Sequence, residues 1–112
     1  MNFILGNIVE QTDSLRQIKK SDLKPGDEVR LKTRNSVYSI KVDVDGGFIV
    51  TGGWFDQMSM SPVRTKINGC TWGGSIIKTD IIAGCGLSLE FGNRLLTSAI
   101  QEIIYFPRSI KN

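Results

Sequence analysis

The chain has 112 residues, of which 40% are hydrophobic and 22% charged, and this composition is typical of one folded domain. Its formal charge of +3 is compatible with a nucleic-acid partner without requiring one, and its apolar runs are too short to predict a membrane span. The absence of histidine excludes Ser–His and Cys–His dyads and most catalytic zinc sites, so we expect no metal, no other cofactor and no enzymatic activity.

Residues 1–22 differ in pattern from the rest and are interpreted as an N-terminal arm. Asp13 is a suitable cap for a short helix, SLRQIKK, whose Leu15 and Ile18 would share one face. Residues 2–9 are mostly apolar, and we expect them to pack against a strand edge of the same or a neighbouring subunit. No basic residue precedes that apolar run, which argues against a secretory signal and favours a cytoplasmic protein.

Residues 23–112 are predicted to form a single β domain. The phrase LKPGD at residues 23–27 is a turn signal, because proline and glycine supply the backbone angles that turns need. Apolar residues then alternate with polar or basic ones as far as residue 51, and Asp45-Gly46-Gly47 is a hairpin signal. This pattern predicts three antiparallel strands.

Further short strands are predicted after an irregular stretch at residues 52–62. They span residues 63–67, 75–83, 87–91, 94–97 and 99–106, with turn signals every eight to twelve residues. That spacing predicts an all-β fold, a small antiparallel barrel or sandwich of about seven strands, without any helix longer than about ten residues after residue 23. The expected core residues are Val29, Leu31, Ile40, Val42, Val50, Ile77, Leu89 and Ile104.

Two stretches of the sequence resemble known kinds of protein. LKPGDEVRLKTRNSVYSIKV resembles the opening of small β-barrels of the Src-homology and Tudor types. Residues 23–107 resemble a family of small uncharacterised bacterial proteins that share phrases like TRNSVYSI, GGWF, INGCTWGGSIIKTDII and LEFGNRLLTS. The second resemblance implies a bacterial source. It implies no activity, so no functional residue is taken from it.

A row of cations on the first predicted strand is the leading candidate site. Residues two apart on a strand lie about 7 Å from each other on one face. If later strands are neighbours, their cations join one patch that suits phosphates or an acidic protein. The same residues are also what the solvated face of an antiparallel sheet carries. The candidate cations are Arg30, Lys32, Arg34, Lys41, Arg64 and Lys66.

Aromatic residues beside glycine pairs form a second candidate. Glycine permits the close approach of a ligand or of another backbone, and two indoles flanking one groove would make a stacking pocket. The alternative is that both tryptophans fill the ends of the domain. The candidate aromatic residues are Tyr38, Trp54, Phe55 and Trp72.

Cys70 and Cys85 are interpreted as reduced, largely buried thiols, with a redox pair or disulfide as the alternative. Asp80 and Glu90 would approach each other if their strands formed a hairpin, and a carboxylate pair permits acid–base chemistry. A salt bridge or solvent exposure is the simpler interpretation of both.

The sequence therefore favours a non-catalytic binding module that uses a basic strand face, with nucleic acid or an acidic protein as its partner. The alternative is a structural protein that forms homo-oligomers through its arm and its strand edges. A thiol- or carboxylate-dependent enzyme is the third hypothesis.

Overall fold

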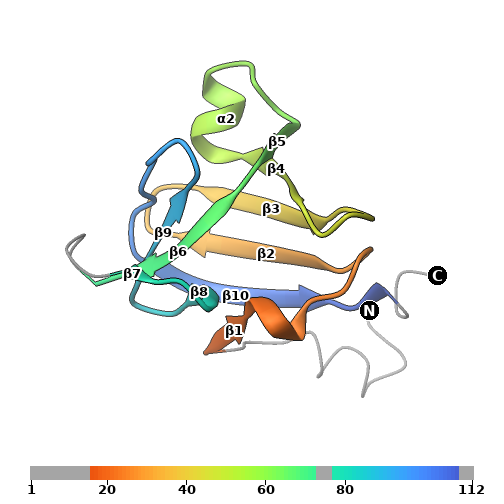
Figure 1. Cartoon of the computed structure of the whole chain (residues 1–112). Coiled ribbons are helices and arrows are strands. Elements are labelled where there is room, and N and C mark those ends of the chain that lie inside the picture. The colour runs from red at the N-terminus through yellow and green to blue at the C-terminus, as the bar shows by residue number, and fades with distance from the viewer. Residues whose placement is uncertain (1–15, 73–76, 109–112) are drawn as a thin grey trace, which may run out of the picture.

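The computed structural model of the protein describes residues 16–72 and 77–108, and nearly all regular structure within them is β-strand (Figure 1). The strands are β1 (Gln17–Lys19), β2 (Glu28–Thr33), β3 (Val37–Val42), β4 (Phe48–Gly52), β5 (Val63–Thr65), β6 (Ile67–Thr71), β7 (Ile77–Lys78), β8 (Ile81–Gly84), β9 (Ser88–Phe91) and β10 (Ile100–Phe106). The helices of the described residues are a 3₁₀ turn, η1 (Lys20–Asp22), and a short α-helix, α2 (Gly53–Gln57). The all-β prediction is confirmed.

The largest sheet has five antiparallel strands in the order β10-β2-β3-β4-β5. At its centre is the predicted three-stranded meander. Val29 and Leu31 of β2 are fully buried, whereas Arg30 and Lys32, which alternate with them along the strand, are exposed. The alternation in the sequence therefore assigns the two faces of this sheet correctly.

Two smaller antiparallel sheets, β7-β6-β9 and β1-β8, complete the domain. β6 follows directly on β5 and crosses in front of the large sheet (Figure 1). The described strands therefore form an open sandwich-like arrangement, and the barrel alternative is wrong. The core between the sheets includes Val29, Leu31, Ile40, Val50, Ile67, Ile82, Leu89, Phe91 and Ile103.

Most of the predicted core positions are buried, but two are not. Ile104 is half-buried, and its neighbour Ile103 is fully buried instead. The register of β10 against β2 shifts between Ile100 and Glu102, and such a bulge exchanges the inward and outward positions that follow it. Ile77 is half-buried because β7 is a two-residue strand at the edge of its sheet. The confirmed positions are Val29, Leu31, Ile40, Val42, Val50 and Leu89.

The predicted N-terminal helix is wrong over the residues that the structure describes. Residues 17–19 form β1, which pairs with β8, and the backbone N–H of Lys20 donates to the carbonyl of Asp80 at 2.9 Å. A helix of seven residues gains little on its own, so pairing with a strand overrides the local pattern. Residues 1–15 lie outside the described residues, and so does the predicted contact of residues 2–9.

The predicted strand at residues 75–83 is interrupted. β7 and β8 are separated by a turn at Thr79 and Asp80, and both of these residues are exposed. Residues 73–76 lie outside the described range.

The turn before β2 is fixed by one buried carboxylate. Asp27 accepts hydrogen bonds from the backbone N–H of Lys24 at 2.9 Å, from the hydroxyl of Tyr105 at 2.8 Å and from the backbone N–H of Arg108 at 2.8 Å. A buried carboxylate is tolerated when donors of this kind satisfy its oxygens. Asp27 therefore ties the predicted LKPGD turn to the end of β10.

Candidate functional site

The outward face of β2 and β3 carries three of the six predicted cations. Arg30 and Lys32 lie on β2, and Lys41 lies on β3 opposite Glu28. The Glu28 carboxylate accepts hydrogen bonds from the Ser39 hydroxyl at 2.7 Å and from Arg30 at 3.2 Å. Arg30 is thus already paired on the surface that we call the basic strand face, namely Arg30, Lys32 and Lys41.

The neighbouring strand β10 adds an acid and apolar groups to this face. Glu102 is the register partner of Lys32, and the Arg30 guanidinium lies 4.9 Å from the centre of the Phe106 ring. A shallow hollow of about 160 Å³ is lined by Arg30, Lys32, Val37, Glu102 and Ile104. The basic strand face is therefore a mixed surface with a modest positive excess.

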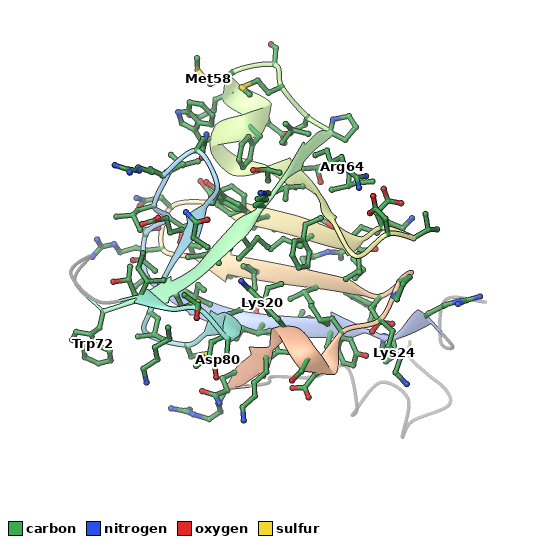
Figure 2. All side chains as sticks on the ribbon, viewed as in Figure 1. Lys20, Lys24, Met58, Arg64, Trp72 and Asp80 are labelled. Atoms are coloured by element: carbon green, nitrogen blue, oxygen red, sulfur yellow. The ribbon has the colours of Figure 1, made fainter. Side chains whose placement is uncertain are left out.

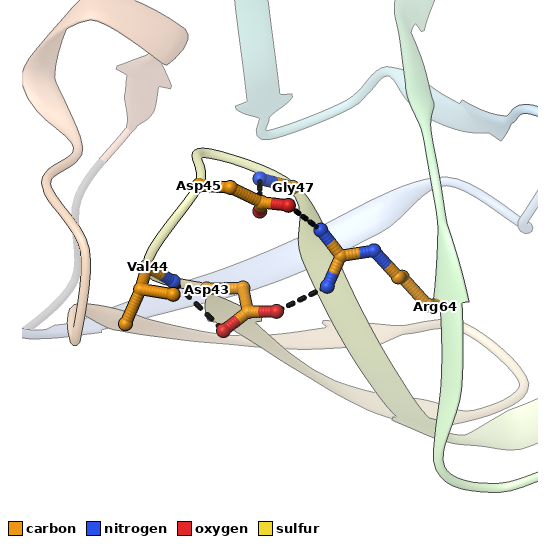
Figure 3. Close-up of polar contacts among 5 residues, drawn as sticks. All are labelled: Asp43, Val44, Asp45, Gly47 and Arg64. Atoms are coloured by element: carbon orange, nitrogen blue, oxygen red, sulfur yellow. Dashed lines mark hydrogen bonds and ion pairs between the residues drawn. The ribbon is translucent and has the colours of Figure 1, made fainter.

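Arg64 and Lys66 do not reinforce that excess. Arg64 donates one hydrogen bond to Asp43 and another to Asp45, which places it across the β3–β4 hairpin (Figure 3). The pKa of Asp43 is lowered by the backbone N–H of Val44 and then by Arg64. Lys66 follows β5 and lines a separate hollow of about 530 Å³ with Arg64 and the hairpin. Arg64 is therefore paired with the hairpin, and Lys66 lies in this separate hollow, away from the basic strand face.

Arg34 lies in the turn between β2 and β3, which is held from two sides. The Thr33 hydroxyl donates to the carbonyl of Ser36 at 3.0 Å and accepts from its backbone N–H at 3.0 Å. The backbone N–H of Arg34 donates to the carbonyl of Ala99 at 3.1 Å, and that of Asn35 donates to the Ser98 hydroxyl at 3.1 Å. Arg34 is exposed on a turn with fixed geometry, and it forms no ion pair with any described residue.

Three of the predicted aromatic residues meet in one cluster with Phe91. Phe55 is buried and lies edge-on to Trp54 and Phe91, with ring centres 5.4 and 5.0 Å away. Tyr38 is 5.5 Å from Phe91 and 6.2 Å from Phe55. Phe55 and Tyr38 are therefore core residues, and the half-buried Trp54 is the outermost ring.

The glycine pair before Trp54 allows the backbone of β3 and the Tyr38 ring to approach this segment closely. A Cβ on Gly52 would lie 2.2 Å from the carbonyl oxygen of Val37, and one on Gly53 would lie 2.3 Å from the Tyr38 ring. Both glycines also have positive φ, at 102° and 46°. Of the two roles predicted for these glycines, contact with another backbone explains Gly52, whereas Gly53 makes room for the Tyr38 ring. The pair leads the chain into α2, where Trp54 joins the aromatic cluster.

Trp72 does not join this cluster. It is 74% exposed and projects from the end of β6 on the side of the molecule away from α2 (Figure 2). The two tryptophans therefore do not flank one groove, and Trp72 does not fill an end of the domain either.

A cavity of about 290 Å³ opens beside Trp54 where the β2–β3 turn meets residues 95–98. We call it the Trp54 pocket. The turn, α2 and the segment after β9 each supply part of its wall. Its lining residues are Thr33, Asn35, Ser36, Tyr38, Trp54, Gln57, Leu95, Leu96, Thr97 and Ser98.

Sequence reasoning singled out only Tyr38 and Trp54 of this lining as site residues. The quoted phrases TRNSVYSI, GGWF and LEFGNRLLTS contain every lining residue except Gln57. These phrases lie far apart in the chain, so single-sequence patterns gave no sign that they meet.

The remaining candidates do not form a reactive site. Cys70 and Cys85 form no disulfide with each other; Cys70 is fully buried as predicted, and Cys85 is partly buried and packs against the core. Burial raises the pKa of the Cys70 thiol to about 11, so it is protonated near neutral pH. Asp80 is exposed in its turn, whereas the Glu90 carboxylate accepts a hydrogen bond from Asn68. Within residues 16–72 and 77–108, no three acidic or cysteine side chains gather as a metal site would require.

Comparison with protein-family models, with curated proteins and with solved structures finds no match. In the part of the chain that the structure describes, no helix is long and apolar enough to cross a membrane. Function is therefore inferred from the geometry of the described residues.

Proposed function

We propose that the protein is a non-catalytic module that binds single-stranded nucleic acid along β2, β3 and the turn between them. The observation that carries the proposal is the line of exposed cations that ends beside the Trp54 pocket. Lys32, Arg34 and Lys41 are exposed and form no ion pair with a described residue. The phosphate backbone of a single-stranded nucleic acid binds to a line of cations, and a nearby aromatic ring can stack with a base.

A single strand suits this surface better than a duplex does. The sheet and its turn form no long helix that would enter a major groove, whereas sheet surfaces with an adjacent aromatic ring bind unpaired bases. Two cysteines without a disulfide between them suit the reducing bacterial cytoplasm in which we place the protein. An acidic protein is the competing partner for the same cations.

The charge of the surface limits the expected affinity. Glu28 and Glu102 offset part of the positive charge. We therefore count one neutralised phosphate at each of three cations, Lys32, Arg34 and Lys41. The logarithm of affinity should then fall against the logarithm of salt concentration with a slope of about −2. Binding should be weak at physiological salt, with a dissociation constant of about 10⁻⁴ M.

The test is fluorescence anisotropy of a labelled single-stranded oligonucleotide titrated at several salt concentrations. Replacing Lys32, Arg34 and Lys41 together by Gln should reduce affinity at low salt at least tenfold and flatten the salt dependence.

The matched control replaces three exposed cations elsewhere, Arg16, Lys24 and Lys78, by Gln. It removes the same charge and should leave most of the affinity. Equal losses in both variants would show a response to net charge alone and reject the site. Binding of polyglutamate but not of oligonucleotides would assign the face to an acidic protein.

The alternative of a homo-oligomer depends on the N-terminal arm, of which residues 1–15 lie outside the described residues, and on the strand edges. It stays a prediction.

A further inference from the structure

The chemistry of the Trp54 pocket differs from that of the basic strand face. Its lining contains amide, hydroxyl, aromatic and leucine side chains and no charged side chain. Trp54 is half-buried and supported from behind by Phe55, while Leu96 is 44% exposed at the opening. A wall of this kind suits a flat uncharged group. Such a group can stack on the indole, and it buries no charge that would lack a partner.

Hydrogen-bonding groups of the pocket are still open to a ligand. The side-chain amides of Asn35 and Gln57 form no hydrogen bond with a described residue, and neither does the indole N–H of Trp54. Each amide offers both donors and an acceptor. The backbone N–H of Asn35 donates to the Ser98 hydroxyl, and this hydrogen bond helps to hold the part of the turn that carries the Asn35 amide.

No cation lines the Trp54 pocket, but two arginines are direct neighbours in sequence of its lining residues. Arg34 lies between the lining residues Thr33 and Asn35, and Arg94 precedes the lining residue Leu95. Both arginines are exposed, and neither forms an ion pair within the described parts of the chain. A neutral pocket with cations outside it matches a nucleotide, whose base is uncharged and whose phosphate is anionic. A sugar alone would not need the arginines.

We propose that the Trp54 pocket holds one unpaired nucleobase, stacked on Trp54 with the Asn35 and Gln57 amides at its edge. The assignment of that base to a bound strand rests on the proposed function. The pocket itself can be tested without phosphates. Adenosine is the probe, because its large ring stacks well and its N6 and N7 edge pairs with a side-chain amide.

The experiment follows ¹H–¹⁵N spectra of the full chain during titration with adenosine. We expect saturable shifts at the Trp54 indole N–H and at the side-chain amides of Asn35 and Gln57, with little dependence on salt. Replacing Asn35 and Gln57 together by Ala should weaken adenosine binding at least fivefold. Both residues are exposed, so the fold should persist. Gln101→Ala, which removes an exposed amide outside the pocket, should leave binding unchanged.

The outcomes separate the two proposals. An absence of shifts at Trp54 overturns the base pocket, even if oligonucleotides bind with the expected salt dependence. Saturable adenosine binding without any oligonucleotide binding would support the base pocket and reject the proposed binding of single-stranded nucleic acid. Equal shifts with methyl glucoside at the same concentrations would show a saccharide pocket and overturn the assignment to a base.

Discussion

Gly52 offers the sharpest test of how the chain places Trp54. It pairs with Tyr38 at the end of β4 and has φ 102° and ψ 179°, a conformation essentially restricted to glycine. A methyl group there would lie 2.2 Å from the carbonyl oxygen of Val37. That atom belongs to the backbone of β3, so it can move only if the pairing of the strands changes.

The expected loss for Gly52→Ala combines two effects. The strained backbone costs about 1–3 kcal/mol, and separation of β3 from β4 weakens ladder hydrogen bonds that contribute about 1 kcal/mol each. We expect the free energy of unfolding to fall by about 3–5 kcal/mol, a large part of the stability of an ordinary domain. Gly46→Ala is the matched control, because Gly46 has φ 87° with nothing within 4 Å of its Cβ position. It should cost about 1–2 kcal/mol.

The assay is urea unfolding of both variants, followed by circular dichroism. The slope against urea should stay constant, so that the midpoints report stability. In Gly52→Ala, the folded protein should also lose near-ultraviolet signal from the aromatic cluster. Equal losses of stability for Gly52→Ala and Gly46→Ala would refute the close approach of the two backbones as the reason for glycine at residue 52.

Three further predictions concern the core and two titrating groups. Ile103→Ala should lower the free energy of unfolding by about 2–5 kcal/mol and Ile104→Ala by less than half as much, and equal losses in urea unfolding would contradict the bulge in β10. A thiol reagent should label Cys85 at least tenfold faster than Cys70, because Cys70 is fully buried and its pKa is raised to about 11; mass spectrometry after timed quenching decides. Burial, and then the hydrogen bond to an aspartate, raise the pKa of Tyr105 to about 12, so the neutral form stabilises the folded state below pH 10 and this contribution is lost as pH rises toward 12. Tyr105→Phe should lose less stability than the wild type over that window, and parallel losses would exclude Tyr105 as the cause.

Local patterns in the sequence determined the central meander. The two-residue alternation around Val29 and Leu31 specified which face of β2 is buried, and Asp45-Gly46-Gly47 specified the following hairpin. Alternation and turn chemistry act between residues that are close in the chain, so one sequence is enough to read them. The same locality allowed Arg30 and Lys32 to be assigned to one exposed face.

Contacts between distant segments decided the rest. The bulge that buries Ile103 arises from pairing with β2, and residues 17–19 are a strand because β8 lies beside them. Arg64 pairs with Asp43 and Asp45, about twenty residues earlier in the chain, and therefore does not contribute to the predicted cation patch. The Trp54 pocket joins a turn, a helix and a later loop. Such a site has no signature in any one stretch, because only the packing of the three segments brings its amides, its indole and its flanking arginines together.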